Sequence, residues 1–135
     1  MAYLLDTNTC IEYLRQRNSA VIARLAAMPP GDVRVCSVVK AELSHGAHRS
    51  QQVQKNLVKV EDFLRPFHSI PFEDDAAREY GRLPSDLERR GRVIGPYDLQ
   101  IAAIALVHGL TLVTHNVNEF RNVIGLNLED WQVTP

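Results

Sequence analysis

The sequence predicts an α/β fold in three layers, α/β/α, with a central parallel sheet of four to five strands. Along the whole chain, short apolar runs alternate with longer segments whose apolar residues recur at helical spacing. The short runs are apolar at nearly every position, which is typical of strands that are buried on both faces. Because crossovers between parallel strands are right-handed, alternating strands and helices place helices on both sides of the sheet.

Composition narrows the class of protein. A chain of 135 residues predicts one domain, 1–135, and its 45% hydrophobic and 23% charged residues are typical of a soluble globular protein. No stretch approaches the roughly 20 apolar residues of a membrane span, and the N-terminus lacks the cationic lead of a signal peptide. Both observations favour the cytoplasm and predict no membrane association. The net charge of −1 excludes a global attraction to nucleic acid, and two isolated cysteines exclude a disulfide framework.

The first half of the chain contains three predicted strands, which are apolar runs bounded by polar or turn residues: 3–5, 33–36 and 67–70. Four segments between them show apolar residues three or four apart and are predicted helices: 10–14, 21–26, 38–43 and 51–64. Ser37 is expected to cap the helix that it precedes, and Pro66 to end the helix before it.

The second half continues the alternation. Acidic residues 73–75 stand where the next helix begins, as the helix dipole favours, and Pro84 is expected to break or kink that helix. Residues 98–108 are apolar on all sides, which predicts a buried helix ending at Gly109. A fourth strand is expected at 110–114, and a short final strand at 131–133.

Acidic or amide side chains stand at four of the predicted junctions. Asp6 ends the first strand, Glu42 lies inside the helix after the second, Asp98 opens the buried helix, and Asn116 and Glu119 follow the fourth strand. The carboxyl ends of parallel strands form one crevice, so these side chains are expected to share it.

Each of these side chains also has a simpler role. Asp6 can cap the following helix, Asp98 can stabilise a helix N-terminus, Asn116 can be a turn residue, and Glu119 can be solvated. Their occurrence at four junctions of the predicted fold favours a shared active site. Asp98 in particular precedes a helix so apolar that its side chain has few directions open to it except the crevice.

Converging carboxylates raise one another's pKa unless a cation lies between them. Mg²⁺ and Mn²⁺ prefer such oxygen ligands, and the chemistry that they support is hydrolysis of phosphate esters. No serine, cysteine or histidine is arranged as a nucleophile. The sequence therefore predicts metal-dependent phosphoryl hydrolysis.

Four stretches of the chain, 4–8, 37–43, 98–103 and 114–120, resemble the successive motifs of PIN-domain ribonucleases, and in particular of VapC toxins from bacterial toxin–antitoxin pairs. The resemblance covers essentially the whole chain and implies a three-layer α/β/α PIN-like fold. It implies Mg²⁺-dependent endoribonuclease activity, with Mn²⁺ as a substitute. It implies a site made of these residues: Asp6, Glu42, Asp98, Asn116 and Glu119, the first three as metal ligands. The family's fourth acidic position is an amide here, Asn116, which weakens the case for a second metal.

The resemblance also implies partners: a VapB-like antitoxin, a second copy of the chain in a homodimer, and structured RNA, commonly transfer RNA. A toxin of this kind inhibits translation until its antitoxin neutralises it. Five arginines between Arg78 and Arg92, and basic residues around Lys55, form either solvated helix faces or contacts to an RNA backbone.

Three other functions share part of this sequence pattern. A phosphatase of the haloacid dehalogenase type needs a second acid where this chain has Asn8, and a P-loop nucleotidase needs a Gly-rich loop that is absent. The third alternative is a PIN fold without activity that only binds RNA or protein. Asn116 favours it, and the presence of Asp6, Glu42 and Asp98 argues against it.

Overall fold

The structure, a computed structural model, describes residues 2–133. Its strands are β1 (Tyr3–Leu5), β2 (Val33–Cys36), β3 (His68–Ile70), β4 (Thr111–Val113) and β5 (Asn127–Glu129). Its helices are α1 (Thr7–Leu14), α2 (Ser19–Ala27), α3 (Ser37–His48), α4 (Val53–Leu64), α5 (Asp74–Arg89), α6 (Pro96–His108) and α7 (Val117–Phe120), with a 3₁₀ turn at Pro30–Asp32. Within the described residues, no helix is long and apolar enough to cross a membrane.

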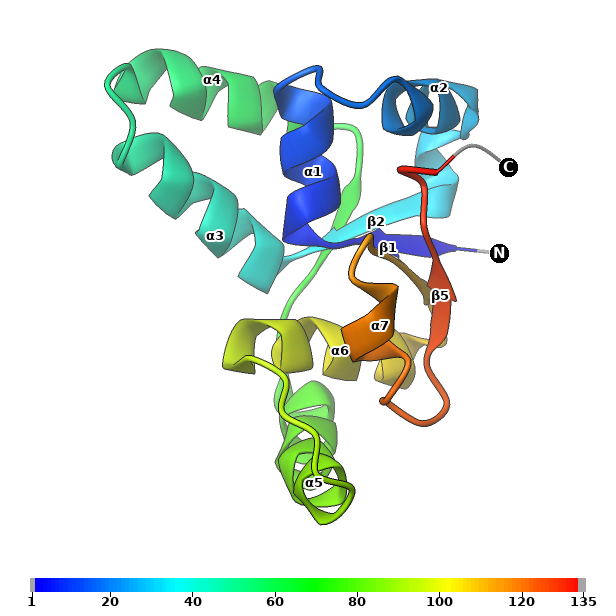
Figure 1. The fold of residues 1–135 in the computed structure, drawn as a ribbon. Helices are drawn as coiled ribbons and strands as arrows, with labels where there is room; N and C mark the ends of the chain where they lie inside the picture. The colour runs from blue at the N-terminus through cyan, green and yellow to red at the C-terminus, as the bar shows by residue number, and fades with distance from the viewer. Residues whose placement is uncertain (1, 134–135) are drawn as a thin grey trace.

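The strands form one sheet in the order β3-β2-β1-β4-β5, and every neighbouring pair is parallel. Helices α1 to α4 cover one face of this sheet, and α5 and α6 cover the other (Figure 1). The predicted three-layer α/β/α fold with a parallel sheet is therefore confirmed.

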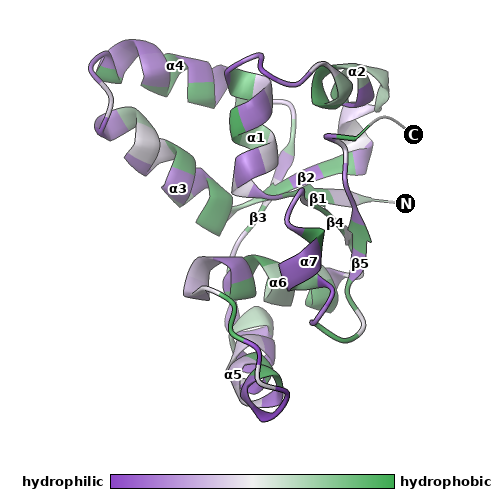
Figure 2. Cartoon of the chain, in the orientation of Figure 1, coloured by the Kyte–Doolittle hydropathy of each residue, from purple (hydrophilic) through white to green (hydrophobic). Residues whose placement is uncertain are grey.

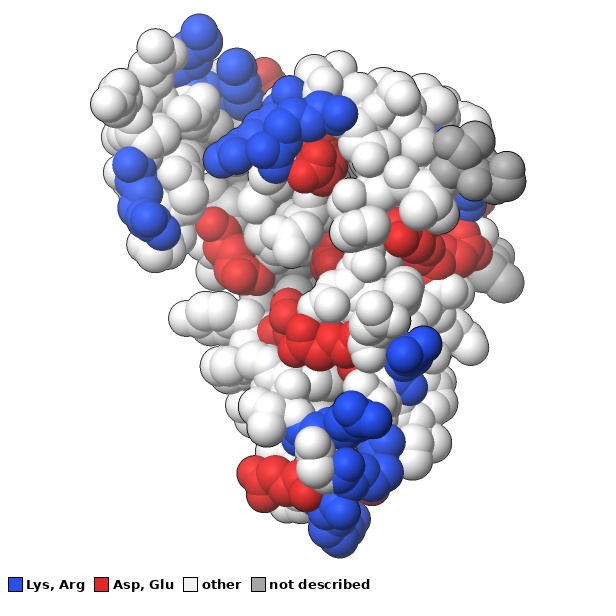
Figure 3. Space-filling model, in the orientation of Figure 1, with Lys and Arg blue, Asp and Glu red and all other residues white. Residues whose placement is uncertain are grey.

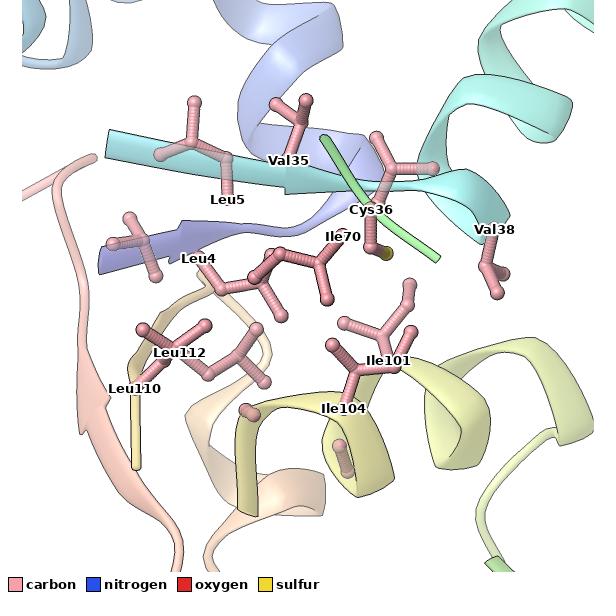
Figure 4. Close-up of a cluster of buried hydrophobic side chains, with 14 of the residues drawn as sticks. Leu4, Leu5, Val35, Cys36, Val38, Ile70, Ile101, Ile104, Leu110 and Leu112 are labelled. Carbon is pink, nitrogen blue, oxygen red and sulfur yellow. The ribbon is translucent and has the colours of Figure 1, made fainter. Parts of the chain in front are cut away.

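The core lies on both faces of the sheet because both faces are covered. Successive strand residues point to opposite sides, so Leu4 and Leu112 face α6 whereas Leu5 and Val35 face the other layer (Figure 4). All four side chains are almost completely buried. The central strands β1 and β4 are accordingly apolar at successive positions, while the outer helices α4 and α5 carry many polar residues (Figure 2).

Helix α6 is the most buried helix, as its sequence predicts. Residues 101–105 have no exposed surface, because α6 lies between the sheet and α5. Gly95 and Pro96 start the helix, since proline at the first helical position already has the helical φ. Gly109 ends the helix in the left-handed conformation, at φ 63°, where a residue without Cβ is favoured.

The structure contradicts two expected helix boundaries: the cap expected at Ser37 and a break at Pro84. Ser37 is the first residue of α3 rather than its cap, and its hydroxyl accepts the N–H of Phe72 at 3.0 Å, which ties α3 to the segment before α5. Helix α5 runs through Pro84, although proline removes one backbone hydrogen bond. The buried side chains of Leu83 and Leu87, on the face packed against α6, keep this segment helical.

The final strand also differs from its predicted position. It is β5, Asn127–Glu129, whereas Trp131 lies in the turn beyond it. Trp131 is 1% exposed because its ring packs against Tyr3 at 5.4 Å and lies under the guanidinium of Arg24 at 5.2 Å. Its apolar character therefore reflects packing at the end of the sheet rather than strand pairing.

Candidate active site

The site lies at the point where the strand order reverses. From β1 the chain continues to β2 and β3 on one side, and β4 and β5 are added on the other side of β1. Such a switch point leaves a crevice at the carboxyl ends of the two strands where the order changes. Asp6 directly follows β1 and Thr114 directly follows β4, so both line this crevice.

Asp6 is the buried centre of the site, with 4% of its surface exposed. Its carboxylate accepts the backbone N–H of Thr9 at 2.8 Å and thereby caps α1. Burial raises the pKa of Asp6, hydrogen bonds from Thr114 and Thr9 lower that pKa in part, and the charge of Glu42 raises it further. Asp6 therefore caps α1 and also lies in the crevice where the sequence predicts the site.

Glu42 reaches the crevice from the second turn of α3. Its carboxylate accepts the hydroxyl hydrogen of Thr7 at 2.6 Å, which links α3 to the start of α1. Thr7, Thr9 and Thr114 were not among the predicted site residues. The sequence signal for Thr7 and Thr114 is that they stand beside the acidic and amide residues of the first and fourth motifs, and Thr9 follows directly after the first motif.

Asp98 is the third residue of α6 and is half-buried. Its pKa is raised to about 6, first by burial and then by the charges of Glu119, Asp6 and Glu42, in that order. Four carboxyl groups from four different parts of the chain are therefore close enough to repel one another.

Asn116 and Glu119 form the outer side of the site. The backbone N–H of Asn116 donates to the hydroxyl oxygen of Thr114 at 3.0 Å. The side-chain amide of Asn116 donates to the carboxylate of Glu119, which lies on the one-turn helix α7. Within residues 2–133 the amide oxygen of Asn116 accepts no hydrogen bond, so it can act as a neutral ligand. The structure thus brings together all five residues that the sequence singled out.

Comparisons with known proteins agree with this geometry. The PIN domain family matches residues 3–126. The tRNA(fMet)-specific endonuclease VapC of Shigella flexneri is 36% identical over 97% of this chain and 98% of its own length. Ribonuclease VapC2 of Haemophilus influenzae is 34% identical with the same coverage. A chain of DNA-bound VapBC from Salmonella typhimurium superposes with a TM-score of 0.91 at 33% identity, covering 97% of this chain and 98% of that one.

The chain belongs to the VapC family of PIN-domain ribonucleases. It is accordingly a metal-dependent endoribonuclease of the VapC type. Solved structures that it resembles are VapBC complexes, in which a chain like this one was crystallised with its partner and DNA. The predicted family, fold and enzyme class are confirmed, and the alternative of a PIN fold without activity is set aside.

The donor set of this VapC-family protein fits a hard divalent cation. All candidate ligands offer oxygen, from carboxylates and one amide, and such ligands suit Mg²⁺ or Mn²⁺. Within residues 2–133, no three acidic, histidine or cysteine side chains already stand in a metal-binding arrangement. Burial is the main cause of the raised pKa values of Asp6 and Asp98, and the charges of neighbouring carboxylates add to it. A cation bound between these groups would favour their ionised form.

The charges around the site are unevenly distributed. Acidic side chains lie around the middle of the face shown in Figure 3, with basic side chains above and below them. Arg82 is paired with Glu79, and Arg89 and Arg90 are both paired with Asp86. Arg82 and Arg89 therefore belong to a solvated helix face, and Arg90, just beyond the helix, also donates to the backbone carbonyl of Asn122. Arg78 and Arg92 form no ion pair within the described chain and stay candidates for RNA contacts.

Proposed function

We propose that this protein is a Mg²⁺-dependent endoribonuclease that hydrolyses phosphodiester bonds in structured RNA, with transfer RNA as its substrate. Mn²⁺ would substitute for Mg²⁺. Cleavage would inhibit translation until the antitoxin binds. The observation that carries this proposal is the convergence of Asp6, Glu42, Asp98 and Glu119 in one crevice. Burial there, together with the charges of the other three carboxylates, raises the pKa of Asp98 to about 6. A transfer RNA substrate is supported by the relative from Shigella flexneri, which is a tRNA(fMet)-specific endonuclease.

Each side chain has a role in this proposal. Asp6, held by Thr9 and Thr114, and Glu42, oriented by the Thr7 hydroxyl, would bind the metal together with Asp98. When bound, the metal lowers the pKa of a water molecule and neutralises charge on the phosphate. Asn116 and Glu119 would complete the outer part of the site.

Expression of three forms of the protein tests the proposal: wild type, Asp98→Asn, and Asp62→Asn. Asp62 is an exposed acid on α4 that pairs with Arg65, so Asp62→Asn is a matched control for the loss of one carboxylate. Sequencing of RNA 5′ ends after brief expression should reveal new ends in transfer RNA for wild type and Asp62→Asn. Asp98→Asn should produce almost none, because a neutral amide binds the metal less well than a carboxylate.

Two outcomes would contradict different parts of the proposal, the site in one case and the substrate in the other. If Asp98→Asn cleaved RNA at the wild-type rate in excess Mg²⁺, the assignment of the site would be wrong. If the wild-type ends lay mainly outside transfer RNA, the site would stand and the substrate would be wrong.

The proposal also covers the oligomeric state and the protein partner. We expect a homodimer in solution that binds a VapB-like antitoxin in the cytoplasm, where transfer RNA is found. Light scattering of the purified toxin distinguishes a mass of one chain from a mass of two.

A further inference from the structure

A groove of about 420 Å³ lies beside the carboxylates, between the first turns of α3 and the start of α6. Glu42 belongs both to this groove and to the carboxylate cluster. Tyr97 lines the groove and directly precedes Asp98. A molecule whose phosphate reaches the carboxylates therefore has its neighbouring groups at the mouth of the groove.

Two aromatic side chains line the groove. Phe72 is fixed, because its backbone N–H donates to the Ser37 hydroxyl at 3.0 Å and its ring meets Tyr80 edge-on at 6.2 Å. Tyr97 is 58% exposed, although it sits on the first turn of the most buried helix. The groove thus offers one anchored ring and one ring with free surface, and aromatic surfaces of this kind stack on nucleobases.

The polar groups of the groove favour a neutral planar ligand over a phosphate. Neither lysine nor arginine lines it in the described part of the chain, and Glu42 would repel an anion. Gln100 and His45 also line the groove. An amide and an imidazole together provide both hydrogen-bond donors and acceptors, which is what recognition of a base edge requires.

We propose that this groove binds one unpaired base of the RNA, next to the phosphate that the carboxylates serve, and that it selects the cleavage position. The base stacks on Tyr97 and Phe72, and Gln100 and His45 contact its edge. This inference rests on the proposed RNA cleavage. It requires the strand to be single-stranded at that position, because a base within an A-form helix cannot be inserted into a groove. A loop of a structured RNA meets this requirement.

A cycle of substitutions in the protein and the RNA tests the proposal. The substrate is an RNA hairpin that carries the mapped cleavage site, with or without an abasic nucleotide on either side of the cleaved bond. With intact RNA, Tyr97→Ala should lower kcat/KM about 5- to 150-fold, the range expected for the loss of one stacked base, and Tyr97→Phe should retain most activity. With RNA that is abasic at the bound position, Tyr97→Ala should cause no further loss.

A control residue lies close by. Val93 is 86% exposed, four residues before Tyr97, and does not line the groove. Val93→Ala should behave as wild type with every RNA. If Tyr97→Ala cleaves intact RNA as fast as wild type does, or is equally impaired when either flanking base is missing, the proposal is overturned.

A fluorescence experiment gives a readout that does not depend on cleavage. RNA containing 2-aminopurine at the flanking position should lose fluorescence when it binds Asp98→Asn, and the loss should disappear in Asp98→Asn/Tyr97→Ala. If the proposed function itself were wrong, Asp98→Asn would still cleave RNA. If Tyr97→Ala weakened antitoxin binding but left quenching and cleavage unchanged, the groove would hold a protein segment and the inference would fail.

Discussion

The raised pKa of Asp98 makes the stability of the protein depend on pH. Its ordinary pKa is 3.8, and burial followed by Glu119, Asp6 and Glu42 raises that pKa to about 6. Between these two values the native protein binds more protons than the unfolded chain does. The free energy of unfolding contributed by Asp98 therefore decreases as the pH rises from about 4 to about 6.

Asp98→Asn should consequently become more stable relative to wild type over that pH range, and the difference should level off above it. Unfolding by urea at several pH values in the presence of a chelator measures this difference. Asp62→Asn serves as the control for removal of an exposed charge. Parallel curves for wild type and Asp98→Asn would show that repulsion at Asp98 does not contribute to stability.

A bound cation should reverse this behaviour, because it stabilises the ionised carboxylates. In Mn²⁺ the advantage of Asp98→Asn should disappear. Mn²⁺ affinity measured by calorimetry should fall as the pH drops below about 6, since protons then compete for Asp98.

At the scale of single elements, α6 positions both the candidate ligand Asp98 and the groove residue Tyr97. Its central residues have no exposed surface, and Ile104 faces the sheet (Figure 4). The helix is therefore held by packing rather than by a side-chain cap, which its N-terminus lacks.

Ile104→Ala should lower the free energy of unfolding by about 2–5 kcal/mol, because it removes buried methylene groups and leaves a cavity. Val107→Ala on the same helix is the matched control. Val107 is 37% exposed, so its truncation should cost less than about 1 kcal/mol. Urea unfolding measures both values, and equal losses would contradict the packing seen for this helix.

For the whole molecule, the arrangement of charge bears on regulation by the antitoxin. Without a metal, four carboxyl groups surround one crevice, and two of their pKa values are raised. An arginine or lysine from the antitoxin would satisfy these carboxylates and exclude the cation.

Inhibition by the antitoxin should therefore compete with the metal. The antitoxin concentration that halves RNA cleavage should increase as Mn²⁺ is raised, and changing the inserted basic residue to alanine should restore activity more than it weakens binding. The control is KCl at the same ionic strength, which separates competition from general screening. Equal potency of the antitoxin at every Mn²⁺ concentration would rule out this mechanism.

The layers of the fold and the set of candidate site residues could be predicted from the sequence alone. Both depend on local patterns. An apolar run followed by a polar turn predicts a buried strand, so Asp6 could be placed at a strand end and Asp98 at the start of a buried helix. The parallel arrangement then places these ends on one edge of the sheet, which is why acids far apart in the chain could be assigned to one crevice.

The contacts between distant segments could not be predicted and are seen only in the folded protein. The Thr7–Glu42 hydrogen bond joins residues 35 positions apart, and the groove between α3 and α6 combines Tyr97 with Phe72. The turn at Trp131 and the unbroken helix at Pro84 were not predicted, for the same reason. Local hydrophobicity and helix propensity do not show which distant segment will cover a side chain. The packing of Trp131 against Tyr3, and of α5 against α6, has a larger effect than these local preferences. Packing between distant segments is settled by the free energy of the whole core, which no short stretch of sequence contains.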